Sequence, residues 1–85
     1  MEEDLYDLNV MNRKDFVKFM HLLHSDFLKN GNGWENNTME RFLEAMSAYT
    51  EAIPGNYSNC ENGKDADIPN WNTFADILRG AIVYE

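Results

Sequence analysis

The sequence has one cysteine, two prolines and no long apolar run among its 85 residues. Cys60 alone cannot form an internal disulfide or a paired redox motif, which fits a reducing compartment. No run approaches the ~18 apolar residues that a membrane-spanning helix needs. The first residues, Glu2, Glu3 and Asp4, are acidic where a secretory signal would be basic. We therefore expect a cytoplasmic protein.

Basic residues are also scarce, because seven Lys and Arg stand against fifteen Asp and Glu, which gives a net charge of −8. An average field of this sign repels phosphate backbones and anionic lipid head groups, so we expect neither nucleic acid nor a membrane as a partner. It favours a basic protein, since complementary charge raises the rate of association. The alternative, that the charge only keeps a small protein in solution, stays open.

Helical periodicity is the main pattern that the sequence does contain. Three segments repeat apolar residues at steps of three and four, which predicts helices at about 13–29, 38–53 and 71–83. No segment shows sustained alternation with the period of two that marks a strand. A chain of 85 residues supports one core, and helices of this length need one another for stability. The sequence therefore predicts a single all-α domain over residues 1–85, built as a small bundle.

The apolar stripes of these helices are the expected core. They comprise Phe16, Phe19, Met20, Leu23 and Phe27 in the first helix, Met39, Phe42, Leu43, Met46, Tyr49 and Ile53 in the second, and Trp71, Phe74, Ala75, Leu78, Ala81 and Ile82 in the third. Trp34, just ahead of the second helix, has two interpretations. It either folds back onto this core, which we favour, or serves as an aromatic anchor for a partner.

Polar and turn-forming residues predict where the helices begin and end. Asn12, Asn37 and Asn70 precede the three helices and can cap their first turns. Gly31 is expected to close the first helix in the left-handed conformation. Pro54 is expected to end the second, because proline lacks the N–H that an inner helical position donates.

A short fourth helix is expected near the amino terminus, at about residues 2–9, where acidic residues come early and Leu5 and Leu8 stand three apart. Leu22 lies away from the apolar stripe of its own helix. We expect Leu5 or Leu8 to cover it, and a homodimer contact through Leu22 and the amino-terminal helix is the alternative.

The stretch 55–70 is predicted to be a loop of about fifteen residues, which is long for a small bundle. Tyr57 and Ile68 are expected to pack it across the helices. Its oxygen-rich residues do not fit the register of a calcium-binding loop, so a solvated turn is the better interpretation. Asp65 and Asp67 then remain as exposed carboxylates.

His21 and His24 stand three apart on the first helix, a spacing that lets both reach one metal ion. The helical wheel instead places His24 among apolar residues, as a neutral, hydrogen-bonded group at the margin of the core. Cys60 lies beside the carboxylate of Glu61, which disfavours a nucleophilic thiolate. We therefore expect a protein that is not an enzyme, with no catalytic residue, no bound metal and no cofactor.

Several short motifs follow one another along the chain. They are Asp15-Phe16 near the first helix start, Trp34-Glu35-Asn36, Phe42-Leu43-Glu44-Ala45 and the closing Tyr84-Glu85. In this order the chain resembles a family of small, acidic, uncharacterised bacterial proteins, over roughly residues 12–85. The resemblance implies bacterial origin and one domain, and it carries no activity and no site residue with it.

The function that the sequence favours is a protein-binding module with an acidic face. Glu40, Glu44, Ser47 and Glu51 share one side of the second helix, opposite its apolar stripe. The expected protein-binding residues are Trp34, Glu40, Glu44, Glu51, Tyr57, Asp65 and Asp67. An immunity protein against a basic bacterial nuclease toxin is one concrete version.

Two alternatives are a small-molecule or metal-binding module that uses His21, His24 and Cys60, and a structural homodimer subunit. We expect a monomer or a weak homodimer that binds a basic protein.

Overall fold

The structure is a computed structural model that describes residues 4–60, 65 and 67–84, with residues 56–60 described by their backbone alone. The described residues form three α-helices and one 3₁₀ turn, and no strand. The elements are α1 (Arg13–Asn30), η1 (Gly31–Gly33), α2 (Met39–Cys60) and α3 (Trp71–Val83). The all-α prediction is therefore confirmed, and the first and third predicted helices match to within one residue.

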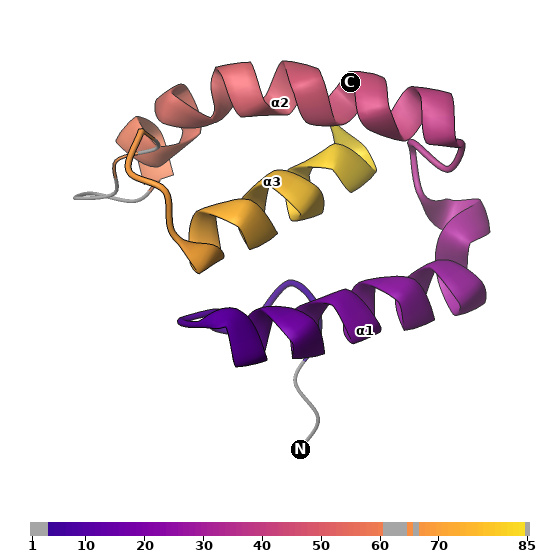
Figure 1. Ribbon diagram of the computed structural model, residues 1–85. Coiled ribbons are helices and arrows are strands. Elements are labelled where there is room, and N and C mark those ends of the chain that lie inside the picture. Colours follow the sequence, from indigo (N-terminus) through magenta and orange to yellow (C-terminus); the bar gives the residue numbers. More distant parts are fainter. Residues whose placement is uncertain (1–3, 61–64, 66, 85) are drawn as a thin grey trace.

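α3 lies between the other two helices (Figure 1). α1 and α2 both pack against α3, and within the described part of the chain their backbones do not come close to each other. The turn η1 and the residues after it join α1 to α2 at one end, and residues 67–70 lead into α3 at the other (Figure 1). The Cα trace has extents of 34 × 30 × 19 Å, so the molecule is thinner along one axis than along the other two.

Side-chain caps explain why α1 and α3 begin where they do. The Oδ1 atom of Asn12 accepts from the backbone N–H of Asp15 at 2.9 Å, and the Asp15 carboxylate accepts from the N–H of Met11 at 3.1 Å. At α3, the Oδ1 atom of Asn70 accepts from the N–H of Thr73 at 2.8 Å. Each bond satisfies a donor that the first helical turn leaves without a partner, which confirms the two predicted caps.

The start of α2 differs from the prediction by one residue. The hydroxyl of Thr38, and not the side chain of Asn37, accepts from the N–H of Arg41 at 3.2 Å. Both residues can cap a helix, so the sequence pattern alone did not separate them.

The predicted end of α2 at Pro54 is wrong, since the helix continues to Cys60 and takes up part of the predicted 55–70 loop. Proline at this position leaves only the carbonyl of Thr50 without its helical donor. Both Thr50 and Pro54 are exposed, so water can reach that side of the helix. The preceding residue, Ile53, is only 2 % exposed and holds this turn of the helix against the core.

α1 ends at Gly31 as expected, but not in the expected conformation. Gly31 has a right-handed φ of −56°, and the chain continues directly into η1. The need for glycine comes instead from a close approach, because a Cβ atom at Gly31 would lie 2.9 Å from the ring of Phe27.

The main core cluster lies where the amino-terminal segment, α1 and α3 meet. Its members are Leu5, Leu8, Val10, Phe19, Leu23, Ala75 and Ile82. Residues 4–8 form a single turn, closed by the Leu8 N–H to Asp4 carbonyl bond at 3.1 Å, so the predicted short helix is not formed there. Leu22 is half-buried against this cluster, as expected for a residue near Leu5 and Leu8.

Arg79 fastens the amino-terminal segment to α3. Its Nε atom donates to the carbonyl of Leu5 at 2.7 Å, Nη2 donates to the carbonyl of Leu8, and Nη1 pairs with Asp76 at 2.8 Å. The guanidinium also lies 5.0 Å from the ring centre of Phe19. One side chain thereby satisfies two backbone acceptors and an acid at the edge of the core.

Several residues that were predicted to be core are exposed. They are Met20, Phe27, Met39, Leu43 and Phe74, and Ile68 of the predicted loop packing is exposed as well. The apolar stripes of the three helices were expected to pack against one another in a bundle. Instead α3 lies between α1 and α2, so the backbones of α1 and α2 stay apart. Apolar side chains therefore remain on the surface along these two helices.

Candidate functional site

The acidic face of α2 consists of Glu40, Glu44, Ser47 and Glu51, and all four residues are exposed. The eleven steps from Glu40 to Glu51 correspond to roughly 16 Å along the helix, at 1.5 Å per residue. The face is therefore long enough to meet several cationic groups of one partner segment.

Trp34 is half-buried near the start of α2, against the apolar side of the helix and not against its acidic face. Its ring centre lies 5.1 Å from that of Phe27, edge to face, and 6.1 Å from that of Phe42, in a stacked arrangement. The indole N–H donates to Asp26 Oδ2 at 2.7 Å, and Asp26 Oδ1 accepts from the side-chain amide of Asn30 at 3.0 Å. These contacts fix the orientation of the indole, and they link α1 to α2 through side chains.

A hollow of about 160 Å³ opens beside Trp34, and we call it the aromatic hollow. Its apolar wall consists of Phe27, Trp34, Met39 and Phe42, and the chain from Asn36 to Thr38 forms the rest. Met39 is 73 % exposed and Phe27 is 43 % exposed, so this apolar surface faces water. Trp34 therefore packs against the core, as the favoured interpretation expects, and an open hollow remains beside its ring.

Asn36 holds this end of the molecule to the end of α3. The residue is buried, and its side-chain amide donates to the carbonyl of Ala81 at 3.0 Å and to that of Tyr84 at 2.7 Å. Its backbone N–H donates to the carbonyl of Ile82 at 3.0 Å. Three carbonyls at the end of a helix thus find donors, and the neighbouring Glu35 stays exposed.

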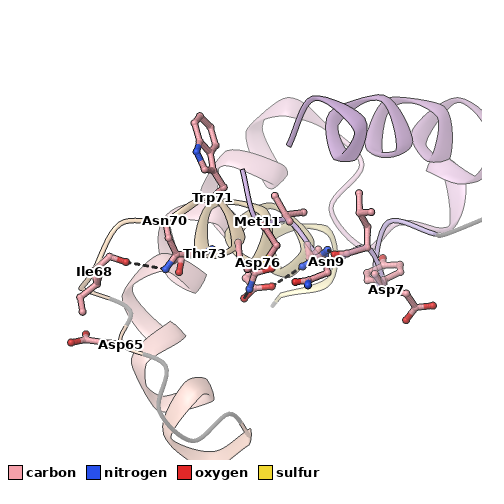
Figure 2. Close-up of a pocket in the computed structure, with 14 residues that line it drawn as sticks. Asp7, Asn9, Met11, Asp65, Ile68, Asn70, Trp71, Thr73 and Asp76 are labelled. Carbon is pink, nitrogen blue, oxygen red and sulfur yellow. Dashed lines mark hydrogen bonds and ion pairs between the residues drawn. The ribbon is translucent and has the colours of Figure 1, made fainter. Parts of the chain in front are cut away.

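A larger cleft of about 740 Å³ lies between the amino-terminal segment and the start of α3 (Figure 2). Its lining residues include Asp7, Asp65, Asp76 and Trp71. Asp76 is bound to Arg79, and the Asp65 carboxylate accepts from the N–H of Asp67 at 2.9 Å. These two carboxylates thus serve local structure.

The predicted site residues fall into two groups. Trp34, Glu40 and Glu44 lie near the start of α2. Asp65 and Asp67 lie in the segment before α3, beyond the opposite end of α2 (Figure 1). Tyr57 lies on the last turns of α2, and its side chain is outside the described residues. The structure therefore places Trp34 and the acids Glu40 and Glu44 at the same end of α2 but on different sides of the helix, and it sets the two aspartates apart.

The histidine prediction is wrong in one respect, because His24 is exposed and not at the margin of the core. His21 is exposed as well. Across residues 4–60, 65 and 67–84, no three His, Cys, Asp or Glu side chains gather as they would around a metal ion. The side chain of Cys60 is outside the described residues. Over the same part of the chain, no helix combines the length and the apolar character required to cross a membrane.

Tyr6 shows the effect of the negative charges on this side of the molecule. Partial burial raises the pKa of its phenol above the ordinary 10.0, and the carboxylates of Asp26 and Asp4 raise it further. Each cause disfavours the phenolate, the first by removing water and the others by repulsion.

One model of a known protein family matches residues 12–85 of the chain. The chain belongs to a family of unknown function (DUF7660). The match spans all three helices, the aromatic hollow and Asn36, and it begins after the amino-terminal segment that supplies Leu5, Leu8 and Val10 to the core. No curated protein and no solved structure matches the chain. The predicted resemblance to an uncharacterised family is thereby confirmed, and the family assigns no site.

Sequence reasoning missed most of the aromatic hollow. Phe27, Met39 and Phe42 carried the signal of core stripes, and only the fold shows that they surround Trp34 at the surface. No sequence pattern identified Asp26, because Asp26 lies on α1 and its hydrogen-bond partner Trp34 lies after η1. The one available signal was the Trp34-Glu35-Asn36 cluster, in which the structure assigns each residue a separate place: hollow, surface and core.

Proposed function

We propose that this member of the family is a non-enzymatic module that binds a basic protein through the acidic face of α2. The observation that carries the proposal is a row of exposed carboxylates along one side of α2. Such a row offers several anionic contacts to one cationic partner surface.

Charge supports the choice of partner. The chain carries −8, and Glu40, Glu44 and Glu51 stand on one exposed side of α2. A field of this sign steers cationic proteins toward the surface and disfavours anionic ones. An immunity-type protein that covers a basic toxin is one concrete form of this function.

The same exposure argues against catalysis by these acids. General acids and bases work best where the site keeps water away from the reacting groups. Glu40, Glu44 and Glu51 all face solvent, where they suit recognition of a charged surface.

The test is affinity capture from a lysate at about 0.05 M and about 0.5 M salt, since the higher concentration screens surface charge. The wild type is compared with the triple variant Glu40→Gln, Glu44→Gln, Glu51→Gln. The matched control, Asp7→Asn, Asp65→Asn, Asp67→Asn, removes the same charge away from α2.

We expect the wild type and the control to retain one basic protein at low salt only, and the α2 variant to lose it. Equal retention by the α2 variant, or retention that does not change with salt, would contradict the proposal.

A further inference from the structure

The outer side of α1 carries most of the positive charge of the chain. Four of its seven Lys and Arg residues lie on this helix, and all four are exposed: Arg13, Lys14, Lys18 and Lys29. At 100° per residue, the three lysines fall on one side of the helix, turned away from the buried Leu23. We call these three lysines the basic face of α1.

The two aspartates of α1 are engaged in local structure. The Asp15 carboxylate accepts from the N–H of Met11, and the Asp26 carboxylate accepts from the indole of Trp34 and the side-chain amide of Asn30. Both aspartates are half-buried, whereas the lysines are exposed. α1 therefore presents a positive outer side in a chain whose net charge is −8.

The basic face of α1 and the acidic face of α2 have matching dimensions. Lys18 and Lys29 are separated by the same eleven steps as Glu40 and Glu51. Eleven steps correspond to roughly 16 Å along a helix. Because the charges are opposite and their spacing is equal, two such faces can form more than one ion pair in a single contact.

The two faces lie on opposite edges of the molecule. α3 lies between α1 and α2, and each charged face is turned away from the buried residues of its own helix (Figure 1). In α2, the glutamates lie across the helix from Ala45 and Ile53, which are buried. A contact between α1 of one copy and α2 of another is therefore heterologous, and it can repeat along a row of copies.

The net charge of −8 opposes self-association less strongly than its size suggests. At physiological ionic strength the screening length is about 8 Å, so charges that lie farther apart than this interact little. The Lys and Glu groups of an ion pair lie within about 4 Å of each other and are screened less. Exposed ion pairs are individually weak, so we expect a dissociation constant of about 0.1–1 mM.

We infer that the basic face of α1 docks on the acidic face of α2 of a second copy, so that copies of the chain associate head to tail. The inference shares the acidic face with the proposed function, and it rests on that function to this extent. It adds a second docking surface, on α1, and a partner that is the chain itself.

The test is sedimentation equilibrium of the full chain from about 0.05 to about 2 mM, at about 0.15 M and about 0.5 M salt. At the lower salt concentration, the average mass is expected to rise from the 9.9 kDa of the monomer to beyond that of a dimer. At the higher salt concentration, it is expected to stay near that of the monomer.

Two variants separate contact between the faces from the effect of net charge. Lys14→Gln with Lys29→Gln makes the chain more negative, and the α2 variant of the capture experiment makes it less negative. Both are expected to weaken self-association about 5-fold or more, because each removes ion pairs from one face. The control variant of the capture experiment keeps both faces and loses negative charge elsewhere, so it should associate at least as strongly as the wild type.

Loss of association in both variants supports the docking, since net charge alone would move them in opposite directions. Stronger association of the α2 variant, or a loss confined to one of the two variants, overturns the inference. A wild type that stays monomeric at about 2 mM overturns it as well, and the basic face then has no partner in a second copy.

Capture of a basic protein decides the proposed function separately. The variant Lys14→Gln with Lys29→Gln keeps the acidic face, so it is expected to retain the captured protein while it loses self-association. If the wild type associates with itself and captures no basic protein, the proposed function fails and the head-to-tail contact stands.

Discussion

At the scale of single residues, Asn36 does more for the fold than its position in a turn suggested. It is a buried polar residue whose amide and backbone supply donors to the carbonyls of Ala81, Ile82 and Tyr84. A buried acceptor that loses its donor costs more than the bond itself contributed, because water cannot replace that donor. The turn that carries Trp34 depends on this attachment.

Replacing Asn36 by Ala is therefore expected to lower the free energy of unfolding by about 1–3 kcal/mol. The measurement is urea unfolding followed by circular dichroism. Asn32→Ala, at an exposed position of η1, is the control and should change stability by less than about 0.5 kcal/mol. Similar losses in both variants would argue against the role given to Asn36.

The raised pKa of Tyr6 makes a prediction about alkaline pH. The folded state favours the neutral phenol, so Tyr6 contributes stability that is present below the ordinary pKa of 10.0 and is lost as pH rises through the higher folded value. Unfolding free energy should fall more steeply in the wild type than in Tyr6→Phe between pH about 9 and about 12.

Tyrosine Cζ resonances in a ¹³C-labelled chain provide the direct check, with the Tyr6 signal assigned from its absence in Tyr6→Phe. Titration of that signal at or below the ordinary value would show that Asp26 and Asp4 do not act on the phenol as described.

At the scale of elements, the packing of α2 on α3 depends on a close approach at Gly80. A Cβ atom there would lie 2.3 Å from the ring of Tyr49, which itself packs edge to face on Tyr84 at 5.4 Å. Glycine weakens a helix, so its presence inside α3 indicates that the space is needed by the neighbouring ring.

Gly80→Ala is expected to destabilise the protein by about 1–3 kcal/mol, because the gain in helix propensity is smaller than the cost of overpacking. Gly55→Ala is the matched control, since it lies within α2 with nothing within 4 Å of the added methyl. The control should stabilise by about 0.5–1 kcal/mol in thermal or urea unfolding. Stabilisation by both substitutions would contradict the close packing.

The starts of α1 and α3 could be predicted from the sequence, because each is marked by a capping residue directly before the helix. Asn12 and Asn70 cap the turn that immediately follows them. Pro54 misled the prediction, because the cost of a missing N–H depends on whether water reaches the abandoned carbonyl, which is a property of the fold. The sequence also did not predict the right-handed conformation of Gly31, because the need for glycine there comes from the nearby ring of Phe27 in the folded chain.

At the scale of the whole molecule, the main difference from a closed bundle is that α3 separates α1 from α2 (Figure 1). Periodicity identifies which side of a helix is apolar, and it does not identify which other helix that side meets. Phe27 and Met39 were therefore predicted to be core, and they are exposed beside Trp34 instead. The acidic face was predictable, since a run of glutamates at helical spacing is its own signal.

The two tryptophans line two different hollows in the described part of the molecule. Trp34 lines the aromatic hollow, and Trp71 lines the cleft in Figure 2. Their indole N–H groups therefore report separately on occupation of the two places.

The most direct measurement is a ¹⁵N-¹H spectrum of the labelled full chain during titration with the basic protein captured at low salt. The account predicts that the amides of residues 40–51 shift, while the Trp71 indole signal stays in place. A shift of the Trp71 signal with unchanged amides of residues 40–51 would contradict recognition at the acidic face of α2.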